Sequence, residues 1–156
     1  MKNINIENIE NILKNLHQSV FDENYRGYDP YDILNSSILP TNYFLRNKYS
    51  GLGLGHSLIQ IGKRCPEIVR KLLKVKKVYN AKGLALLSKS LLKMSVYFDN
   101  PNYAILGLRL LSYLVKNSNK NFSSMCWGYS HPWINNKRAL PLNYPNVVVT
   151  SFVIDS

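Results

Sequence analysis

The chain has 156 residues, 46% of them hydrophobic, which is enough for one domain with a packed core. It carries 20 Lys and Arg residues against 9 Asp and Glu, for a net charge of +11. The two cysteines, in unrelated contexts, form neither a disulfide framework nor a CxxC metal or redox motif, and no apolar run approaches the about 18 residues of a membrane span. The N-terminus also lacks the apolar core of a signal peptide, so we expect a cytoplasmic protein that could lie peripheral to a membrane.

The first half of the chain predicts short helices separated by turns. Apolar spacing over residues 4–20 predicts an amphipathic helix that ends at the turn formers of FDENYRGYDP. Asp32 is then placed to cap a second helix, ILNSSILPTNYFLR, which Pro40 breaks or kinks. The glycines of SGLGLGHS lack a preceding strand and a following GK[ST], so they indicate a flexible helix entry. Helical pieces over 56–63 and 66–74 meet at a Cys-Pro pair.

The second half predicts a helical hairpin, a long loop and a last apolar element. Residues 81–98 and 100–118 form the two helices, the second with Asn100 as its cap and Pro101 in its first turn. A loop over 119–145 carries both tryptophans. The valine run that follows suits a strand by propensity, but we favour a buried helix because no partner strand is evident. Without βαβ alternation, the prediction is a single all-α domain of antiparallel helical hairpins over residues 1–156.

The apolar segment Val147–Ile154 has no following sequence to cover it. We therefore expect either that a second copy or a complementary chain covers this segment, or that the polypeptide is the front part of something longer. A separate cluster of ten basic residues and one acid lies between Lys63 and Lys93. Such a cluster is typical of a solvated helix face, or of a surface that binds nucleic acid, an anionic membrane or an acidic substrate.

Three stretches carry candidate chemistry: a Tyr/Asp junction, an aromatic loop and basic residues near helix ends. Sugar rings stack their CH groups on aromatic faces while carboxylates bind the hydroxyls, so together these stretches suit a saccharide pocket. The candidate catalytic residues are Asp29 and Asp32. The candidate substrate-binding residues are Tyr28, Tyr31, Arg64, Arg70, Lys82, Trp127, Tyr129, His131 and Trp133.

Each candidate also has a structural alternative. Asp29 and Asp32 can share acid and base roles if their carboxyl groups lie about 5–9.5 Å apart, or can cap a helix and bind loop amides. His131 can act as an acid or base, or simply pack and hydrogen-bond. The tryptophans can stack on substrate or fill the core. The histidines show no ligand spacing, so neither a metal site nor a cofactor is expected.

Four motifs in order carry a resemblance: GYDPYD.LNS, Q..KR.P...R.LL...K.YN.KGLALL, CWGY..PW and PNVVVTSF. This set, from about Tyr25 to Phe152, resembles a family of (α/α)6-toroid, six-hairpin glycosidase-like proteins. They occur in bacterial and archaeal polysaccharide or surface-glycan gene clusters. The family's motif positions fall on Asp29, Asp32, Arg64, Arg70 and Lys82, among others. Ala81 replaces a proline typical of the family, and His131 stands where an aromatic residue is expected.

The resemblance implies the N-terminal portion of a toroid, whose complete form needs twelve helices in six hairpins. In such toroids the loops at one end line a central cavity, where the aspartate and aromatic motifs would gather. The leading hypothesis is therefore a carbohydrate-active or glycan-assembly protein that binds a saccharide. An anionic or lipid-linked saccharide would match the charge of the basic residues. The alternatives are a non-catalytic helical scaffold or glycan-binding module, such as one half of a split toroid, and, ranked last, a nucleic-acid-binding protein.

Overall fold

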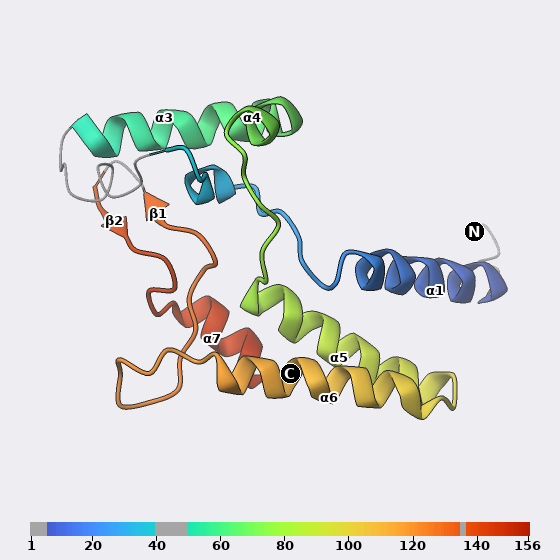
Figure 1. The fold of residues 1–156 in the computed structure, drawn as a ribbon. Helices are drawn as coiled ribbons and strands as arrows, with labels where there is room; N and C mark the ends of the chain where they lie inside the picture. Colours follow the sequence, from blue (N-terminus) through green and yellow to red (C-terminus); the bar gives the residue numbers. More distant parts are fainter. Residues whose placement is uncertain (1–5, 40–49, 135–136) are drawn as a thin grey trace, which may run out of the picture.

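A computed structural model describes residues 6–39, 50–134 and 137–156 of the chain. The fold is mostly helical, which confirms the all-α prediction at this coarse level (Figure 1). The toroid arrangement stays a prediction. In chain order the elements are α1 (Ile6–Asp22), the 3-10 helix η1 (Asp32–Asn35), α3 (Ser50–Arg64), α4 (Pro66–Leu72), α5 (Ala81–Tyr97), α6 (Pro101–Lys116), β1 (Trp133–Ile134), β2 (Ala139–Leu140) and α7 (Val147–Ile154).

The main core lies where the α5–α6 hairpin meets α7. Asn80 and Asn100 cap the two hairpin helices through their side chains, as predicted for Asn100. Gly107 lets α6 approach α5 closely, and its carbonyl oxygen accepts a hydrogen bond from Ser88 Oγ at 2.8 Å. α7 packs against α5 (Figure 1). The buried cluster consists of Leu84, Ala85, Leu91, Leu110, Leu114, Trp127, Val149 and Val153.

A second, smaller core joins η1, α3 and the β1–β2 hairpin. Leu34, Ile59 and Ile134 form its buried centre. Gly62 permits the close packing of α3 on η1, because a Cβ there would overlap the side chain of Ile33. Figure 1 shows α3 and α4 on one side of the molecule and the α5–α6–α7 group on the other, with extended segments between them.

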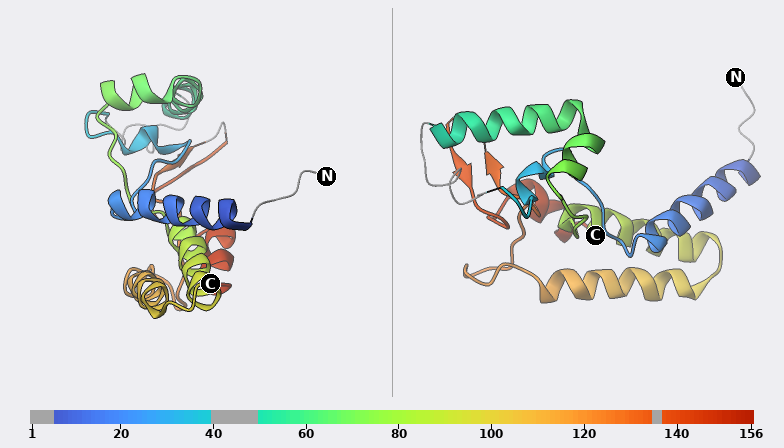
Figure 2. Two further views of the ribbon diagram at one scale, coloured as in Figure 1. Left: turned by 90° about the vertical axis from the view of Figure 1, so that its right-hand side faces the viewer. Right: turned by 45° about the horizontal axis from the view of Figure 1, so that its top comes forward.

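Helix α1 contacts the body along only part of its surface. None of its residues is buried, and in Figure 2 the helix extends toward the N-terminus away from the α3 side. Its contacts with the hairpin include Tyr97, which donates to Glu10, and the ring of Tyr103, which lies edge-on to His17. In the described ranges no helix has the length and apolar character needed to cross a membrane.

Several sequence predictions need correction. The glycine segment expected to be a flexible helix entry lies inside α3, which begins at Ser50. The helix expected from Ile33 onward is a four-residue 3-10 helix, and the part of that prediction after Leu39 lies outside the described residues. The loop expected over 119–145 contains the short antiparallel pair β1–β2. The helix expected at 147–154 is confirmed as α7, but only Val149 and Val153 on it are buried.

Candidate functional site

The site forms where the segment between α1 and η1 crosses the connection between α4 and α5. Isolated antiparallel bridges join Gly27 to Val78 and Ser36 to Val75. These bridges place the Tyr28–Asp32 turn beside the start of α5 and the last turn of α4. The predicted Tyr/Asp junction is therefore held between the two halves of the molecule (Figure 1).

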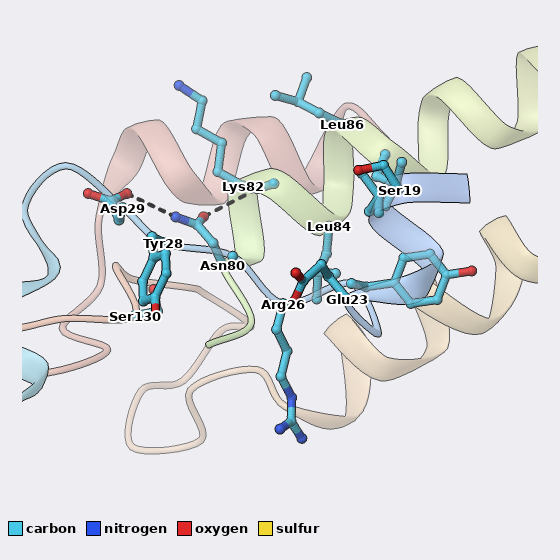
Figure 3. A pocket seen from close by; sticks show the side chains of 15 residues that line it. Ser19, Glu23, Arg26, Tyr28, Asp29, Asn80, Lys82, Leu84, Leu86 and Ser130 are labelled. Atoms are coloured by element: carbon cyan, nitrogen blue, oxygen red, sulfur yellow. Dashed lines mark hydrogen bonds between the residues drawn. The ribbon is translucent and has the colours of Figure 1, made fainter. Parts of the chain in front are cut away.

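Asp29 is oriented by the N-terminus of α5. Its Oδ2 accepts a hydrogen bond from Asn80 Nδ2 at 3.2 Å, and its Oδ1 accepts one from the backbone N–H of Tyr31 at 3.0 Å. Asn80 is itself fixed, because its Oδ1 caps α5 by accepting from Gly83 N (Figure 3). One asparagine thus links the start of a helix to a partly exposed carboxylate.

Asp32 is buried, and both of its carboxylate oxygens accept a hydrogen bond. Its side chain is 1% exposed, and its Oδ1 pairs with Arg70 Nε at 3.2 Å. Its Oδ2 accepts from the backbone N–H of Asp29 at 3.0 Å. The prediction that Asp32 caps a helix is wrong: it lies inside η1, no side chain caps that helix, and the carboxylate instead holds the turn.

Arg70 completes this turn. Its Nη2 donates to the carbonyl oxygen of Asp29 at 2.9 Å, and its guanidinium lies 4.4 Å from the centre of the Tyr28 ring. The structure therefore brings Tyr28, Asp29, Asp32 and Arg70 together at this turn. Arg70 thus holds the turn through two hydrogen bonds and places its positive charge beside the buried carboxylate of Asp32.

His131 is 1% exposed and lies between two tyrosine rings. Its ring stacks on Tyr31 at 6.3 Å and on Tyr129 at 5.4 Å between centroids. Its Nδ1 lies 3.8 Å from Asp29 Oδ1, and neither ring nitrogen has a hydrogen-bond partner among the described residues. Burial lowers the pKa of His131 below its usual 6.5, although the charges of Asp29 and Asp32 partly oppose this shift. The imidazole is therefore neutral at pH 7.

A pocket of about 670 Å³ opens between the end of α1 and the start of α5. We call it the α1–α5 pocket (Figure 3). Its polar side chains include Tyr28, Asp29, Lys82 and Ser130, and the Ser130 Oγ has no partner among the described residues. Val20, Leu86 and Leu87 contribute to its apolar wall.

A smaller pocket of about 170 Å³, the hairpin pocket, lies beside β1 and β2. The bridge between Gly128 and Pro145 holds the aromatic loop against the segment that precedes α7. Gly128 is needed there, because a Cβ would overlap the backbone of Tyr144. The lining residues are Tyr129, His131, Trp133, Arg138, Leu140, Pro141, Tyr144 and Asn146.

Five predicted site residues are outside the linings of both pockets: Tyr31, Asp32, Arg64, Arg70 and Trp127. Trp127 fills the main core, where its Nε1 donates to the Leu114 carbonyl oxygen at 2.8 Å, so the core alternative describes it. Arg64 is exposed in the last turn of α3. Sequence reasoning missed Asn80 and Ser130 as pocket residues. Asn80 had a usable signal, because it directly precedes the most regular helix pattern in the chain.

The described residues hold no group of three or more His, Cys, Asp or Glu side chains that could bind a metal ion. Comparisons with protein-family models, curated proteins and solved structures find no match to this chain. The toroid resemblance therefore stays a prediction.

Proposed function

We propose that this chain binds a saccharide in the α1–α5 pocket. The observation that carries the proposal is an oriented, partly exposed carboxylate beside an aromatic ring. Asp29 is held on both oxygens, and the side chain of Tyr28, a 45% exposed residue, lines the same pocket. A volume of about 670 Å³ lies within the range of about 300–1,000 Å³ that is usual for ligand pockets.

The chemistry of the lining matches a hydroxylated ring. Each oxygen of Asp29 accepts one hydrogen bond within the protein and retains a lone pair for a ligand hydroxyl. The Tyr28 ring and the aliphatic wall provide apolar surface for CH groups. Lys82 also lines the pocket, and its Nζ, which lies 4.2 Å from the centre of the Phe152 ring, supplies a positive charge for an anionic substituent.

The geometry supports binding more directly than cleavage. Asp32 is 1% exposed and its carboxylate is engaged in an ion pair with Arg70, so it is not accessible to a ligand. Asp29 is the more accessible of the two carboxylates. A glycosidase-like reaction that uses both aspartates therefore stays a prediction, and a glycan-binding module accounts for the same contacts without it.

The test is a calorimetric titration of the whole chain with neutral and anionic oligosaccharides. We expect Y28A, D29N and K82M each to weaken binding about tenfold or more, which corresponds to about 1.4 kcal/mol. K93M is the matched control, because Lys93 is an exposed residue of the same helix outside the pocket. Equal affinity in all four variants and the wild type, or no binding of any oligosaccharide, would overturn the proposal.

A turnover assay on the same oligosaccharides separates the enzyme from the binding module. If the chain is a hydrolase, D29N abolishes product formation while it retains part of the affinity for the oligosaccharide. If wild type forms no product from a saccharide that it binds, the chain is a binding module.

A further inference from the structure

We propose that the outward side of α4 docks on the surface of a membrane rich in anionic lipid. The docking surface, which we call the α4 face, consists of Ile68, Lys71 and Leu72 on the helix, with Arg64 just before it and Lys74 just after it. None of these residues lines either pocket, so the inference does not depend on the proposed saccharide-binding function.

Helix α4 has an inward side and an outward side. On the inward side, Arg70 donates to the carbonyl oxygen of Asp29 and so holds the turn of the candidate site. On the outward side, Ile68 and Leu72 lie one helical turn apart and are 72% and 73% exposed, and the exposed Lys71 lies beside them. Figure 1 shows α4 next to α3, on the side of the molecule away from α6. Two large apolar side chains are thus presented together to the surroundings.

The charge around α4 is strongly positive. Residues 63–74 contain five basic residues and one acid, Glu67. The side chains of Arg64, Lys71 and Lys74 are exposed and form no ion pair among the described residues. Basic side chains near a membrane are attracted to anionic headgroups, and this attraction adds to the insertion of apolar side chains at the interface. The α4 face therefore combines the two contributions on which peripheral membrane binding depends.

The charge also separates the α4 face from other exposed apolar surface. Helix α1 exposes Ile12 and Leu16, but it carries three acidic residues and one lysine, so an anionic surface would repel it. A second copy of the chain is a poor occupant of the α4 face, because a contact between two such faces would bring like charges together. An anionic lipid surface matches the charge and accepts the apolar side chains.

The test is co-sedimentation of the whole chain with lipid vesicles at about 0.15 M salt. One set contains phosphatidylserine and phosphatidylcholine, and the other contains phosphatidylcholine alone. We expect wild type to bind only the anionic set. I68S/L72S should bind it about tenfold more weakly, although the net charge is unchanged. L108S is the matched control, because Leu108 is an exposed apolar residue of α6, and it should bind as wild type does.

The charge is tested in both directions. K71Q/K74Q should bind the anionic vesicles about tenfold more weakly. E67Q removes the one acid of the segment and should bind about threefold more tightly than wild type. K93M removes a positive charge from an exposed position on α5 and should change binding less than twofold, by about the precision of the assay.

The proposal is overturned if wild type binds neither set of vesicles, or binds both equally. It also fails if I68S/L72S binds as wild type does. In that case the face attracts polyanions by charge alone, and binding of single-stranded RNA with the same dependence on Lys71 and Lys74 would identify a nucleic acid as the partner. E67Q provides a reading that does not depend on the folding of the double variants, since an affinity no higher than that of wild type contradicts the proposal.

Discussion

Asp29 and Asp32 lie three residues apart, but their surroundings give them different tasks. Asp32 is sealed behind Arg70 and stabilises the turn, whereas Asp29 faces a pocket and is held by Asn80. The difference comes from α4, which delivers Arg70 across 38 residues of sequence. The cost of burying Asp32 is offset only while that guanidinium is present.

We predict that R70M destabilises the protein by about 3–5 kcal/mol, because it leaves a buried carboxylate without its counter-charge. R70K retains the charge but loses the second donor to the Asp29 carbonyl oxygen, so its loss should be smaller. Urea denaturation measures both, with the exposed neighbour K71M as the control. A loss below about 1 kcal/mol in R70M would show that Asp32 does not depend on the ion pair.

His131 makes the stability sensitive to pH. Its folded-state pKa lies below 6.5, so the unfolded chain binds the proton more tightly. Stability should therefore be fully present above pH 6.5 and fall as the pH drops below that value. His17, whose pKa burial also lowers, contributes in the same direction.

Urea midpoints at pH 5, 6 and 7 test this prediction. We expect H131F to flatten the pH dependence of the free energy of unfolding, leaving only the part due to His17 and the carboxylates. The double variant H131F/H17F should flatten it further. If H131F has the same slope as wild type, the proton on His131 does not couple to folding.

At the scale of elements, helix termini determine much of the site. Asn80, Asn100 and Asn146 each cap a helix through the side chain, and the cap of α5 also donates to Asp29. Capping is worth about 1 kcal/mol, and it fixes the amide in one orientation. The donor that holds Asp29 is therefore set by the geometry of a helix start.

We predict that N80D separates these two roles. Asp retains the oxygen that caps α5, so stability should stay within about 1 kcal/mol of wild type. The amide donor is replaced by a carboxylate beside Asp29, and saccharide affinity should fall about tenfold. N100D, at the start of α6, serves as the matched control and should change neither quantity. A fall in stability with unchanged affinity would contradict the prediction.

The sequence predicted elements well where a local pattern repeats. Helices at 81–98 and 100–118 follow from apolar spacing, the second also from its Asn-Pro start, and both appear within two residues of the predicted ends. The strands β1 and β2 were missed because two-residue strands have no period to detect. The role of Asp32 was misjudged because its partner, Arg70, is remote in sequence, whereas a cap needs only local residues.

At the scale of the whole molecule, apolar side chains remain exposed at α7. Val147 is 81% exposed and Ile154 is 74% exposed, while Val149 and Val153 face the core. Such surface favours association, and cover by a second copy stays the prediction that the sequence suggested.

Light scattering of the purified chain across a dilution series checks this prediction. We expect a dimer that dissociates on dilution, and a monomer throughout for the double variant V147E/I154E. A wild-type monomer at every concentration would mean that α7 needs no partner.

The crossing that builds the site also bears on the order of folding. The α5–α6 contact between Ser88 and Gly107 spans 19 residues, but Asn80 reaches Asp29 across 51 and Asn35 reaches the Ser130 carbonyl oxygen across 95. Closing longer loops costs more chain entropy, so the helical hairpin should assemble early and the site last. A bound sugar would then hold the crossing segments together. It would slow the first step of unfolding and leave the formation of the hairpin unchanged.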